Sequence, residues 1–194
     1  IVTHMLGERA GRKHDAFIAQ TSPGNQSVGR NVLEVTGLST KDGKVADASV
    51  YVAAGEIVGL FGMVGAGKTE LLEALYGIRP IQNAELKIGF AEISTRLWNV
   101  RGAIARGLAL VPEDRLKNAL IATESASWNL AAPYWRGPKR LVAALGKMEH
   151  NLAESATKLV TIRGSLLNEP ISSLSGGNKQ KISVTRWLVG SSPP

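Results

Sequence analysis

The sequence predicts an α/β fold with an additional helical portion, and three patterns carry this prediction. A nearly unbroken apolar run at 56–61 is typical of a strand buried on both faces. A glycine-rich segment at 62–67 follows it, and 68–76 then has the spacing of an amphipathic helix. From about 123 to 161 the pattern becomes mainly helical. A strand, a tight turn and a helix in succession are the unit from which α/β domains are built.

Composition narrows the classes of protein that this chain can be. Its 194 residues, 44% of them hydrophobic, can bury one good-sized core with a small appendage. The absence of cysteine excludes a disulfide framework and a cysteine-ligated metal site. No apolar run approaches the roughly 18–20 residues that cross a bilayer, and the opening residues lack a signal-peptide pattern. We therefore expect a soluble, cytosolic protein.

The charge of the chain is basic but dispersed. The formal net charge is +7, from 23 Lys and Arg against 16 Asp and Glu. Such a balance suits nucleic acid, anionic lipid or a polyphosphate ligand. The densest basic groups, at 9–14 and 136–140, are short and carry no interleaved aromatic residues for stacking on bases. We interpret these groups as solvated surface.

Strand patterns alternate with polar segments along the first half of the chain. Residues 1–30 are polar and show no sustained period, which indicates a linker or tail. Short strands are expected at 32–35, 48–52 and 86–89. The apolar runs at 56–61 and 108–111 indicate strands of the buried, parallel type, and we expect Tyr51 and Phe61 to lie in strands as part of the core.

Helices are expected at 68–76 and 99–106, and again beyond 123. Gly77 and Pro80 end the first of them. Its apolar positions should lie on one side of the helix, and they are Leu71, Leu72, Leu75 and Tyr76. Ser175 is expected to cap a last helix that runs to about Val189.

The segment Gly62-Met63-Val64-Gly65-Ala66-Gly67-Lys68-Thr69 fits the phosphate-loop pattern G-x-x-x-x-G-K-[ST] without a mismatch. Glycines allow backbone N–H groups to curl around phosphates, and the following helix points its positive end at them. Lys68 would reach the β and γ phosphates, and the Thr69 hydroxyl would bind Mg²⁺. A chance match in a glycine-rich turn is the alternative, but the flanking strand and helix supply the context that the motif requires.

A second motif lies at Leu174-Ser175-Gly176-Gly177-Asn178-Lys179-Gln180. A serine followed by glycines at a helix start offers a hydroxyl and bare N–H groups to an anion. By itself this segment would be an ordinary helix N-cap. Beside a phosphate loop it indicates a second phosphate-binding element.

With both motifs the chain resembles ATP-binding-cassette (ABC) nucleotide-binding domains, whose signature sequence is LSGGQ. The resemblance implies an incomplete P-loop nucleoside triphosphate hydrolase fold, with a mostly parallel sheet, a flanking antiparallel portion and a helical subdomain. It also implies ATP and Mg²⁺ as cofactors. Ser175, Gly176 and Gly177 would close over ATP held by a second cassette, in a head-to-tail pair.

Narrower features resemble the second cassette of monosaccharide importers of the ribose, galactose, arabinose and xylose type. They are LSGGN followed by Lys179-Gln180-Lys181, Pro112-Glu113-Asp114-Arg115, and the segment from Gly65 to Leu71. The resemblance implies an ATPase that powers sugar import, works with membrane permease subunits at the inner face of the cell membrane, and does not itself bind sugar. Glu113 would line the reacting end as a catalytic and Mg²⁺-contacting residue, beside the catalytic Lys68.

We expect four segments in this chain. Residues 1–30 form a linker from a preceding cassette, 31–122 the ATP-binding core, 123–172 the helical subdomain, and 173–194 the signature motif with its helix. The resemblance places an apolar strand ending in Asp-Glu beyond residue 194. We therefore expect a piece of a longer protein that by itself binds nucleotide weakly and hydrolyses it very poorly.

Two departures from the family concern nucleotide contacts. The stretch 39–44, where an aromatic residue usually stacks on adenine, has none, so the preference for ATP over GTP is expected to be loose. Glu70 stands where many cassettes place a second hydroxyl. Two alternatives stay open: a non-transport cassette acting on nucleic acid or the ribosome, which predicts salt-sensitive nucleic-acid binding, and a regulatory module that binds nucleotide without turnover.

Overall fold

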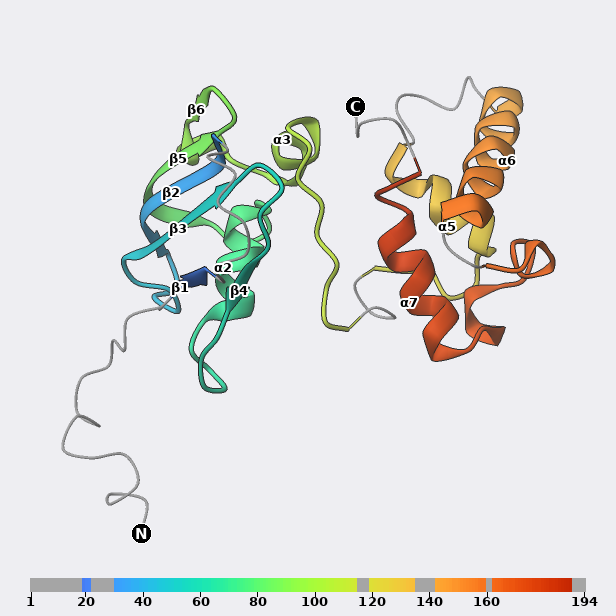
Figure 1. Ribbon diagram of the computed structural model, residues 1–194, viewed down its shortest axis with the longest axis horizontal. Coiled ribbons are helices and arrows are strands. Elements are labelled where there is room, and N and C mark those ends of the chain that lie inside the picture. The colour runs from blue at the N-terminus through green and yellow to red at the C-terminus, as the bar shows by residue number, and fades with distance from the viewer. Residues whose placement is uncertain (1–18, 22–29, 115–118, 135–141, 160–161, 190–194) are drawn as a thin grey trace, which may run out of the picture. The chain divides into compact units, whose positions relative to one another are not determined.

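A computed structural model describes residues 19–21, 30–114, 119–134, 142–159 and 162–189. The chain divides into two compact units, Ile1–Ala103 and Ile104–Pro194 (Figure 1). The first unit combines strands with the helix α2, and the second is built from helices. The division falls upstream of residue 123, where we expect the helical subdomain to begin.

A four-stranded antiparallel sheet forms the body of the first unit, with strand order β3-β2-β5-β6. Its strands are β2 (Asn31–Thr40), β3 (Ala48–Ala53), β5 (Ile81–Ile88) and β6 (Ala91–Ile93). The strands predicted at 32–35, 48–52 and 86–89 are confirmed, although β2 and β5 extend further than their patterns indicate. The antiparallel portion of the expected fold is therefore present.

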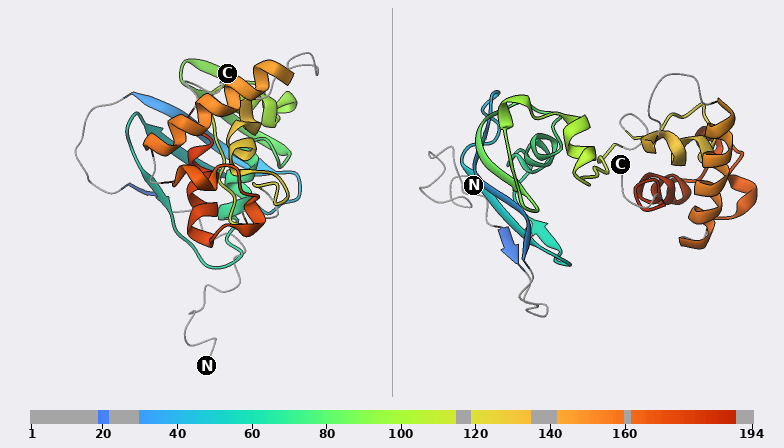
Figure 2. Two further views of the ribbon diagram at one scale, coloured as in Figure 1. Left: turned by 90° about the vertical axis from the view of Figure 1, so that its right-hand side faces the viewer. Right: turned by 90° about the horizontal axis from the view of Figure 1, so that it is seen from above.

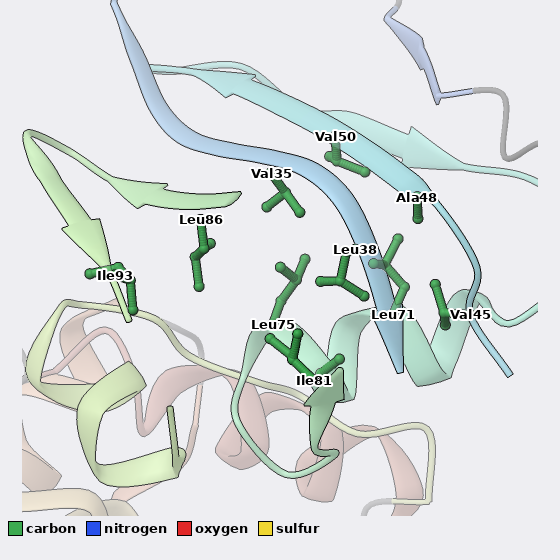
Figure 3. Close-up of a cluster of buried hydrophobic side chains, with 11 residues drawn as sticks. Val35, Leu38, Val45, Ala48, Val50, Leu71, Leu75, Ile81, Leu86 and Ile93 are labelled. Carbon is green, nitrogen blue, oxygen red and sulfur yellow. The ribbon is translucent and has the colours of Figure 1, made fainter. Parts of the chain in front are cut away.

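The helix α2 (Lys68–Leu75) packs against this sheet, and the two share one hydrophobic core (Figure 3). The buried residues of the core are Val35, Leu38, Val45, Ala48, Val50, Leu71, Ala74, Leu75, Ile81, Leu86 and Ile93. Leu71, Leu75 and Tyr76 are buried as predicted, but Leu72 is 44% exposed. The prediction for Leu72 was wrong because Ala74, a small residue, takes part in the buried face instead.

The apolar run at 56–61 forms only the short strand β4 (Val58–Leu60), which pairs antiparallel with β1 (Ala19–Thr21). We predicted a strand buried on both faces, but Ile57 and Phe61 are 90% and 72% exposed. β4 is paired with a single strand, so its apolar residues are covered incompletely. β1 also places a strand inside the segment 1–30, where we expected only a linker.

Tyr51 does not belong to the core either. It lies on β3, is 49% exposed, and its hydroxyl is hydrogen-bonded to that of Thr36 at 3.0 Å. A tyrosine on the outer face of a sheet keeps its polar end in contact with water. The prediction that Tyr51 and Phe61 are core residues was therefore wrong.

The 3₁₀ helix η2 (Thr95–Leu97) follows the sheet, and helix α3 (Val100–Ala105) spans the division between the units. The helix predicted at 99–106 is confirmed. The predicted strand at 108–111 is absent, and its residues are partly or fully exposed without regular secondary structure. All strand pairs among the described residues are antiparallel. A parallel-type strand needs a neighbouring strand, and none of the described strands pairs with 108–111.

The second unit contains α5 (Ala126–Ala131), α6 (Val142–Leu159) and α7 (Gly176–Thr185), with short 3₁₀ helices η3 (Ala132–Tyr134), η4 (Gly164–Leu166) and η5 (Ile171–Ser173). Figure 2 shows α5, α6 and α7 gathered together. Their shared core is formed by Leu120, Ala126, Leu130, Ala156, Ile162, Ile171, Leu174 and Ile182. α7 ends earlier than predicted, at Thr185.

The buried Asn129 fastens the loop before α5 onto that helix. Its amide oxygen accepts a hydrogen bond from the Ile121 N–H at 2.8 Å, and its amide nitrogen donates to the carbonyls of Ile121 and Ser125. A buried amide is tolerated when both of its ends are satisfied in this way. Asn129 therefore orders the loop that leads into the helical unit.

Candidate phosphate-binding site

The loop 62–67 connects β4 to α2 and owes its shape to two glycines. Gly65 and Gly67 have φ angles of +84° and +80°, in the left-handed region that glycine adopts with little cost. Gly67 is also the N-cap of α2. The loop therefore delivers the chain into the helix through a sharp turn, with Met63, Val64 and Ala66 exposed around it.

Gly67 is required for a second, steric reason. A Cβ atom at this position would lie 2.7 Å from the carbonyl oxygen of Lys44, which is closer than side-chain carbons approach backbone atoms. A Cβ atom at Gly65 would meet no atom within 4 Å. The two glycines thus share a backbone conformation, but only Gly67 lies tightly against another part of the chain.

Lys68 folds back over the loop that precedes it. Its ammonium group donates hydrogen bonds to the carbonyl of Gly62 at 2.7 Å and to that of Met63 at 2.8 Å. An ammonium group has three donors, so one remains for a ligand at the mouth of the loop. The positive charge is therefore held at the centre of the segment that the sequence predicts to bind phosphate.

The first turn of α2 adds backbone donors to this charge. Its first helical hydrogen bond runs from the Leu71 N–H to the Gly67 carbonyl at 2.8 Å. The N–H groups of Lys68, Thr69 and Glu70 precede this bond and have no acceptor within the helix. Together with the helix dipole they favour an anion at this end. The exposed Thr69 hydroxyl lies on the same turn.

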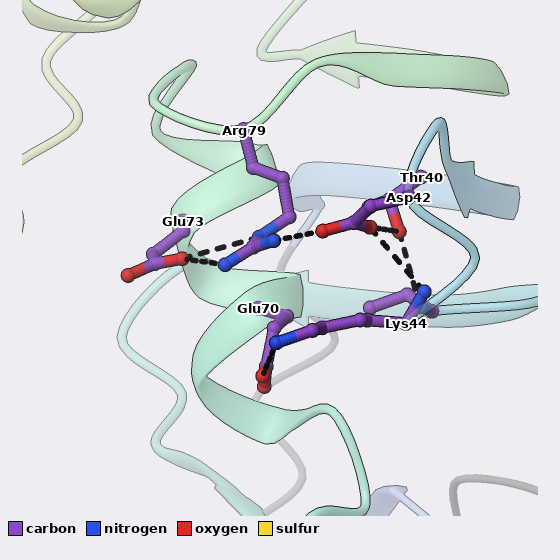
Figure 4. A network of polar contacts seen from close by, with 7 residues as sticks. Thr40, Asp42, Lys44, Glu70, Glu73 and Arg79 are labelled. Atoms are coloured by element: carbon purple, nitrogen blue, oxygen red, sulfur yellow. Dashed lines mark hydrogen bonds and ion pairs between the residues drawn. The ribbon is translucent and has the colours of Figure 1, made fainter.

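A tight turn at residues 40–45 lies against the loop, and it overlaps the stretch 39–44 where the family resemblance places a contact to adenine. The Thr40 N–H donates to the Val45 carbonyl at 3.0 Å, and the Thr40 hydroxyl donates to Asp42 at 2.7 Å. Lys44 pairs with Glu70 of α2, its Nζ atom 3.7 Å from Oε1 (Figure 4). The only local signal is the Asp42-Gly43 dipeptide, which is typical of turns.

The guanidinium group of Arg79 joins this turn to α2. It donates to the carboxylate of Asp42 and to that of Glu73, the latter from Nη2 at 2.6 Å and from Nε at 3.1 Å (Figure 4). The Lys41 N–H also donates to the Pro80 carbonyl at 3.1 Å. The turn 40–45 is therefore held at two places. Lys44 contacts the first turn of α2, and Asp42 contacts Arg79, which follows the helix.

We expect Asp42→Asn to cause a small loss of stability at neutral pH that becomes smaller in acid. The hydrogen bond from the Thr40 hydroxyl, with help from the Lys44 N–H and Arg79, holds the pKa of Asp42 below its ordinary value of 3.8. Because the folded-state pKa is the lower one, the stabilisation is present above pH 3.8 and is lost as the pH falls through the folded-state pKa. Urea unfolding of both proteins at about pH 7 and about pH 3 measures this difference.

The exposed carboxylate of Asp47, outside this network, provides the control. Asp47→Asn removes a carboxylate outside the contacts with Thr40 and Arg79, so it should cost less stability than Asp42→Asn at neutral pH. An equal effect of the two substitutions at both pH values would contradict the role of Asp42.

In the second unit, Ser175 caps α7 as predicted. Its hydroxyl accepts a hydrogen bond from the Asn178 N–H at 3.4 Å. Gly176 and Gly177 are exposed, and a Cβ atom on either would meet nothing within 4 Å. Packing inside the chain therefore does not explain why these residues are glycines.

The predicted site residues fall into two sets. Residues 62–69 belong to the first unit, whereas Glu113 and Ser175-Gly176-Gly177 belong to the second. Glu113 is exposed, in a segment without the preceding strand that we predicted. Among the described residues, no group of three or more His, Cys, Asp or Glu side chains gathers in a way that could hold a metal ion.

Comparison with known protein families identifies the family of this chain. Residues 45–193 match the family model described as ABC transporter. The chain belongs to the ABC transporter family. The matched range contains both the phosphate loop of this ABC domain and its LSGGN segment.

Relatives of this ABC domain include ATP-binding proteins of sugar import. It is 38% identical to a galactose/methyl galactoside import ATP-binding protein of Treponema pallidum, over 84% of the chain and 33% of that protein. It is 36% identical to a ribose import ATP-binding protein of Streptomyces coelicolor, over 83% of the chain and 31% of that protein. The chain thus spans about a third of the length of these relatives, and the predicted resemblance to sugar importers is confirmed.

Solved structures confirm the fold of this ABC domain. A nucleotide-free ATP-binding cassette from an ABC transporter superposes with a TM-score of 0.61 at 15% identity, over 82% of the chain and 65% of that protein. The cassette cbiO1 of Clostridium perfringens gives a TM-score of 0.59 at 20% identity, with 82% and 61% covered. Across the described part of the ABC domain, no helix has the length and apolar character needed to cross a membrane.

Proposed function

We propose that this chain is a nucleotide-binding domain that powers sugar import, and that it binds MgATP at Gly62-Met63-Val64-Gly65-Ala66-Gly67-Lys68-Thr69. One observation carries the proposal: the Lys68 ammonium group is fastened to the Gly62 and Met63 carbonyls where the first turn of α2 presents its free N–H groups. A cation and converging backbone donors around a glycine turn suit a polyphosphate. The names of the relatives favour transport over the alternative of nucleic-acid binding.

The residues of the loop fit a magnesium-bound triphosphate. Gly65 and Gly67 keep side chains away from the loop backbone, and Lys68 neutralises phosphate charge. Mg²⁺ prefers oxygen ligands, and the Thr69 hydroxyl of the loop would be one of them. The ion supplies charge neutralisation and orientation of the phosphate oxygens when bound. For Glu113, in the second unit, the catalytic and Mg²⁺-contacting role remains part of the proposal.

Ser175, Gly176 and Gly177 would serve a second cassette. Their exposure at the N-terminus of α7, without any neighbouring atom in the way of a Cβ, leaves room for a ligand that belongs to another domain. In this proposal the two cassettes pair head to tail, close around ATP, and pass that closure to membrane permease subunits at the inner face of the membrane. This domain makes no contact with the sugar.

We expect Lys68→Ala to weaken MgATP binding about thirtyfold, because a charge-assisted hydrogen bond contributes about 2 kcal/mol. Titration of the chain with a fluorescent ATP analogue, displaced by unlabelled MgATP, measures the dissociation constant. In the full-length protein assembled with its permease subunits, the same substitution should stop ATP-driven sugar uptake.

Lys87→Ala is the matched control, since it removes the same charge from β5 of the first unit. It should bind MgATP as the unchanged chain does. Equal affinities of the Lys68→Ala and Lys87→Ala proteins would refute the proposed site.

A further inference from the structure

We propose that Lys44 sets the affinity of the phosphate loop by neutralising Glu70. We also propose that Asp42 and Arg79 are positioning residues that hold Lys44 at this place. This inference rests on the proposed nucleotide site and names two further parts of it: a compensating charge pair and the clamp that orients it.

Glu70 places a negative charge where a polyphosphate would bind. It is the third residue of α2 and lies in the first turn, beside Lys68 and Thr69. An acidic residue in this turn interacts favourably with the helix dipole. The same carboxylate repels any anion that approaches this end of the helix. Glu70 thus stabilises α2 at the expense of phosphate affinity, unless a cation offsets it.

Lys44 is the cation in the right position. Its Nζ atom lies 3.7 Å from Oε1 of Glu70, and the Glu70 side chain is only 21% exposed. The main chain of Lys44 also lies close to the phosphate loop, because its carbonyl oxygen would be 2.7 Å from a Cβ atom on Gly67. Lys44 therefore touches the phosphate loop through its main chain and balances the loop's acidic neighbour through its side chain.

The turn that carries Lys44 is held on two sides. Within the turn, the Lys44 N–H donates to Oδ1 of Asp42 at 3.3 Å. Outside it, the other carboxylate oxygen of Asp42 accepts from Arg79, whose guanidinium group also donates to Glu73 of α2 (Figure 4). The Arg79 side chain is 22% exposed, so its position is restricted. Asp42 and Arg79 therefore anchor the turn to the same helix whose first turn Lys44 contacts.

A double-mutant cycle in the 194-residue chain tests the charge pair. Lys44→Met should weaken MgATP binding about fivefold, as an exposed ion pair allows. Glu70→Gln should strengthen binding about threefold, because the Lys44 charge is then uncompensated. Lys44→Met added to Glu70→Gln should return the affinity to about that of the unchanged chain, because both charges of the pair are then gone. Both single effects should be smaller for MgADP than for MgATP, and should shrink in about 0.5 M salt.

The alternative mechanism gives a different result. If Lys44 contacted the phosphates directly, its loss would exceed what Glu70→Gln gains, so the double variant would bind MgATP much more weakly than the unchanged chain. That result would overturn the proposal. Lys41→Met is the matched control, because it removes the same charge from the same turn and should leave the affinity unchanged.

A second cycle tests the clamp. Arg79→Met should weaken MgATP binding about threefold, but should add little to a chain that already carries Lys44→Met. Arg79→Lys should restore part of the loss. An undiminished effect of Arg79→Met in the Lys44→Met chain would show that Arg79 does not act through Lys44.

Failure of this inference is distinguishable from failure of the proposed function. If Lys68→Ala does not weaken binding, the nucleotide site itself is refuted. If Lys68→Ala weakens binding as expected while Lys44→Met has no effect, only the charge pair is refuted. Glu70→Gln gives an independent result should Lys44→Met fold poorly, since unchanged or weaker binding by Glu70→Gln would also overturn the pair.

Discussion

Gly67→Ala lowers the free energy of unfolding of the first unit by about 3 kcal/mol. The left-handed backbone of Gly67 costs an alanine about 1 kcal/mol. Its Cβ atom would then lie 2.7 Å from the Lys44 carbonyl, which forces the turn 40–45 and the loop apart and costs about 2 kcal/mol more. Urea unfolding measures this loss of stability, with hydrogen exchange of the peptides that cover α2 as the readout.

Gly65→Ala separates these two causes. Gly65 has nearly the same φ angle, +84°, but a Cβ atom there meets nothing within 4 Å. The expected loss is therefore only the backbone cost, about 1 kcal/mol. Equal losses for the two glycines would mean that the contact between Lys44 and Gly67 does not constrain the loop. MgATP affinity should fall more for Gly67→Ala, because the backbone donors move with the loop.

Leu71→Ala destabilises the first unit by a similar amount, about 3 kcal/mol. Leu71 is fully buried in the core that α2 shares with the sheet, and its truncation to alanine leaves a cavity there. Leucine-to-alanine changes in such places cost about 2–5 kcal/mol. The same hydrogen-exchange experiment reports this loss directly, since its peptides cover α2.

Leu72→Ala is the control, because the two leucines are adjacent in one helix but Leu72 is 44% exposed. Its replacement should cost less than about 1 kcal/mol, and alanine favours the helix slightly. A large loss at Leu72 would contradict the assignment of the buried face of α2.

The phosphate loop shows which structural features can be predicted from short stretches of sequence. Apart from the close approach of the Lys44 carbonyl to Gly67, the left-handed glycines at 65 and 67, the start of α2 at Lys68 and the cap at Ser175 arise from interactions between residues a few positions apart. Such interactions are encoded in short patterns. The burial of neighbouring apolar residues is not encoded in this way. Leu72, Phe61 and the run at 108–111 are apolar, but whether they are covered depends on which element lies opposite.

The sequence by itself determined the phosphate-loop pattern and the second motif, because each depends on residues that are close together in the chain, and the two motifs together indicate the family. The steric part of the glycine requirement at Gly67 comes from Lys44, far away in the sequence. Only the tertiary structure decided that the turn 40–45 lies on this loop. Asp42 and Arg79 are 37 positions apart and carry no shared pattern. Packing of α2 on the sheet brings Asp42 and Arg79 together, and their ion pair forms as a result. The same packing brings Lys44 close to Glu70.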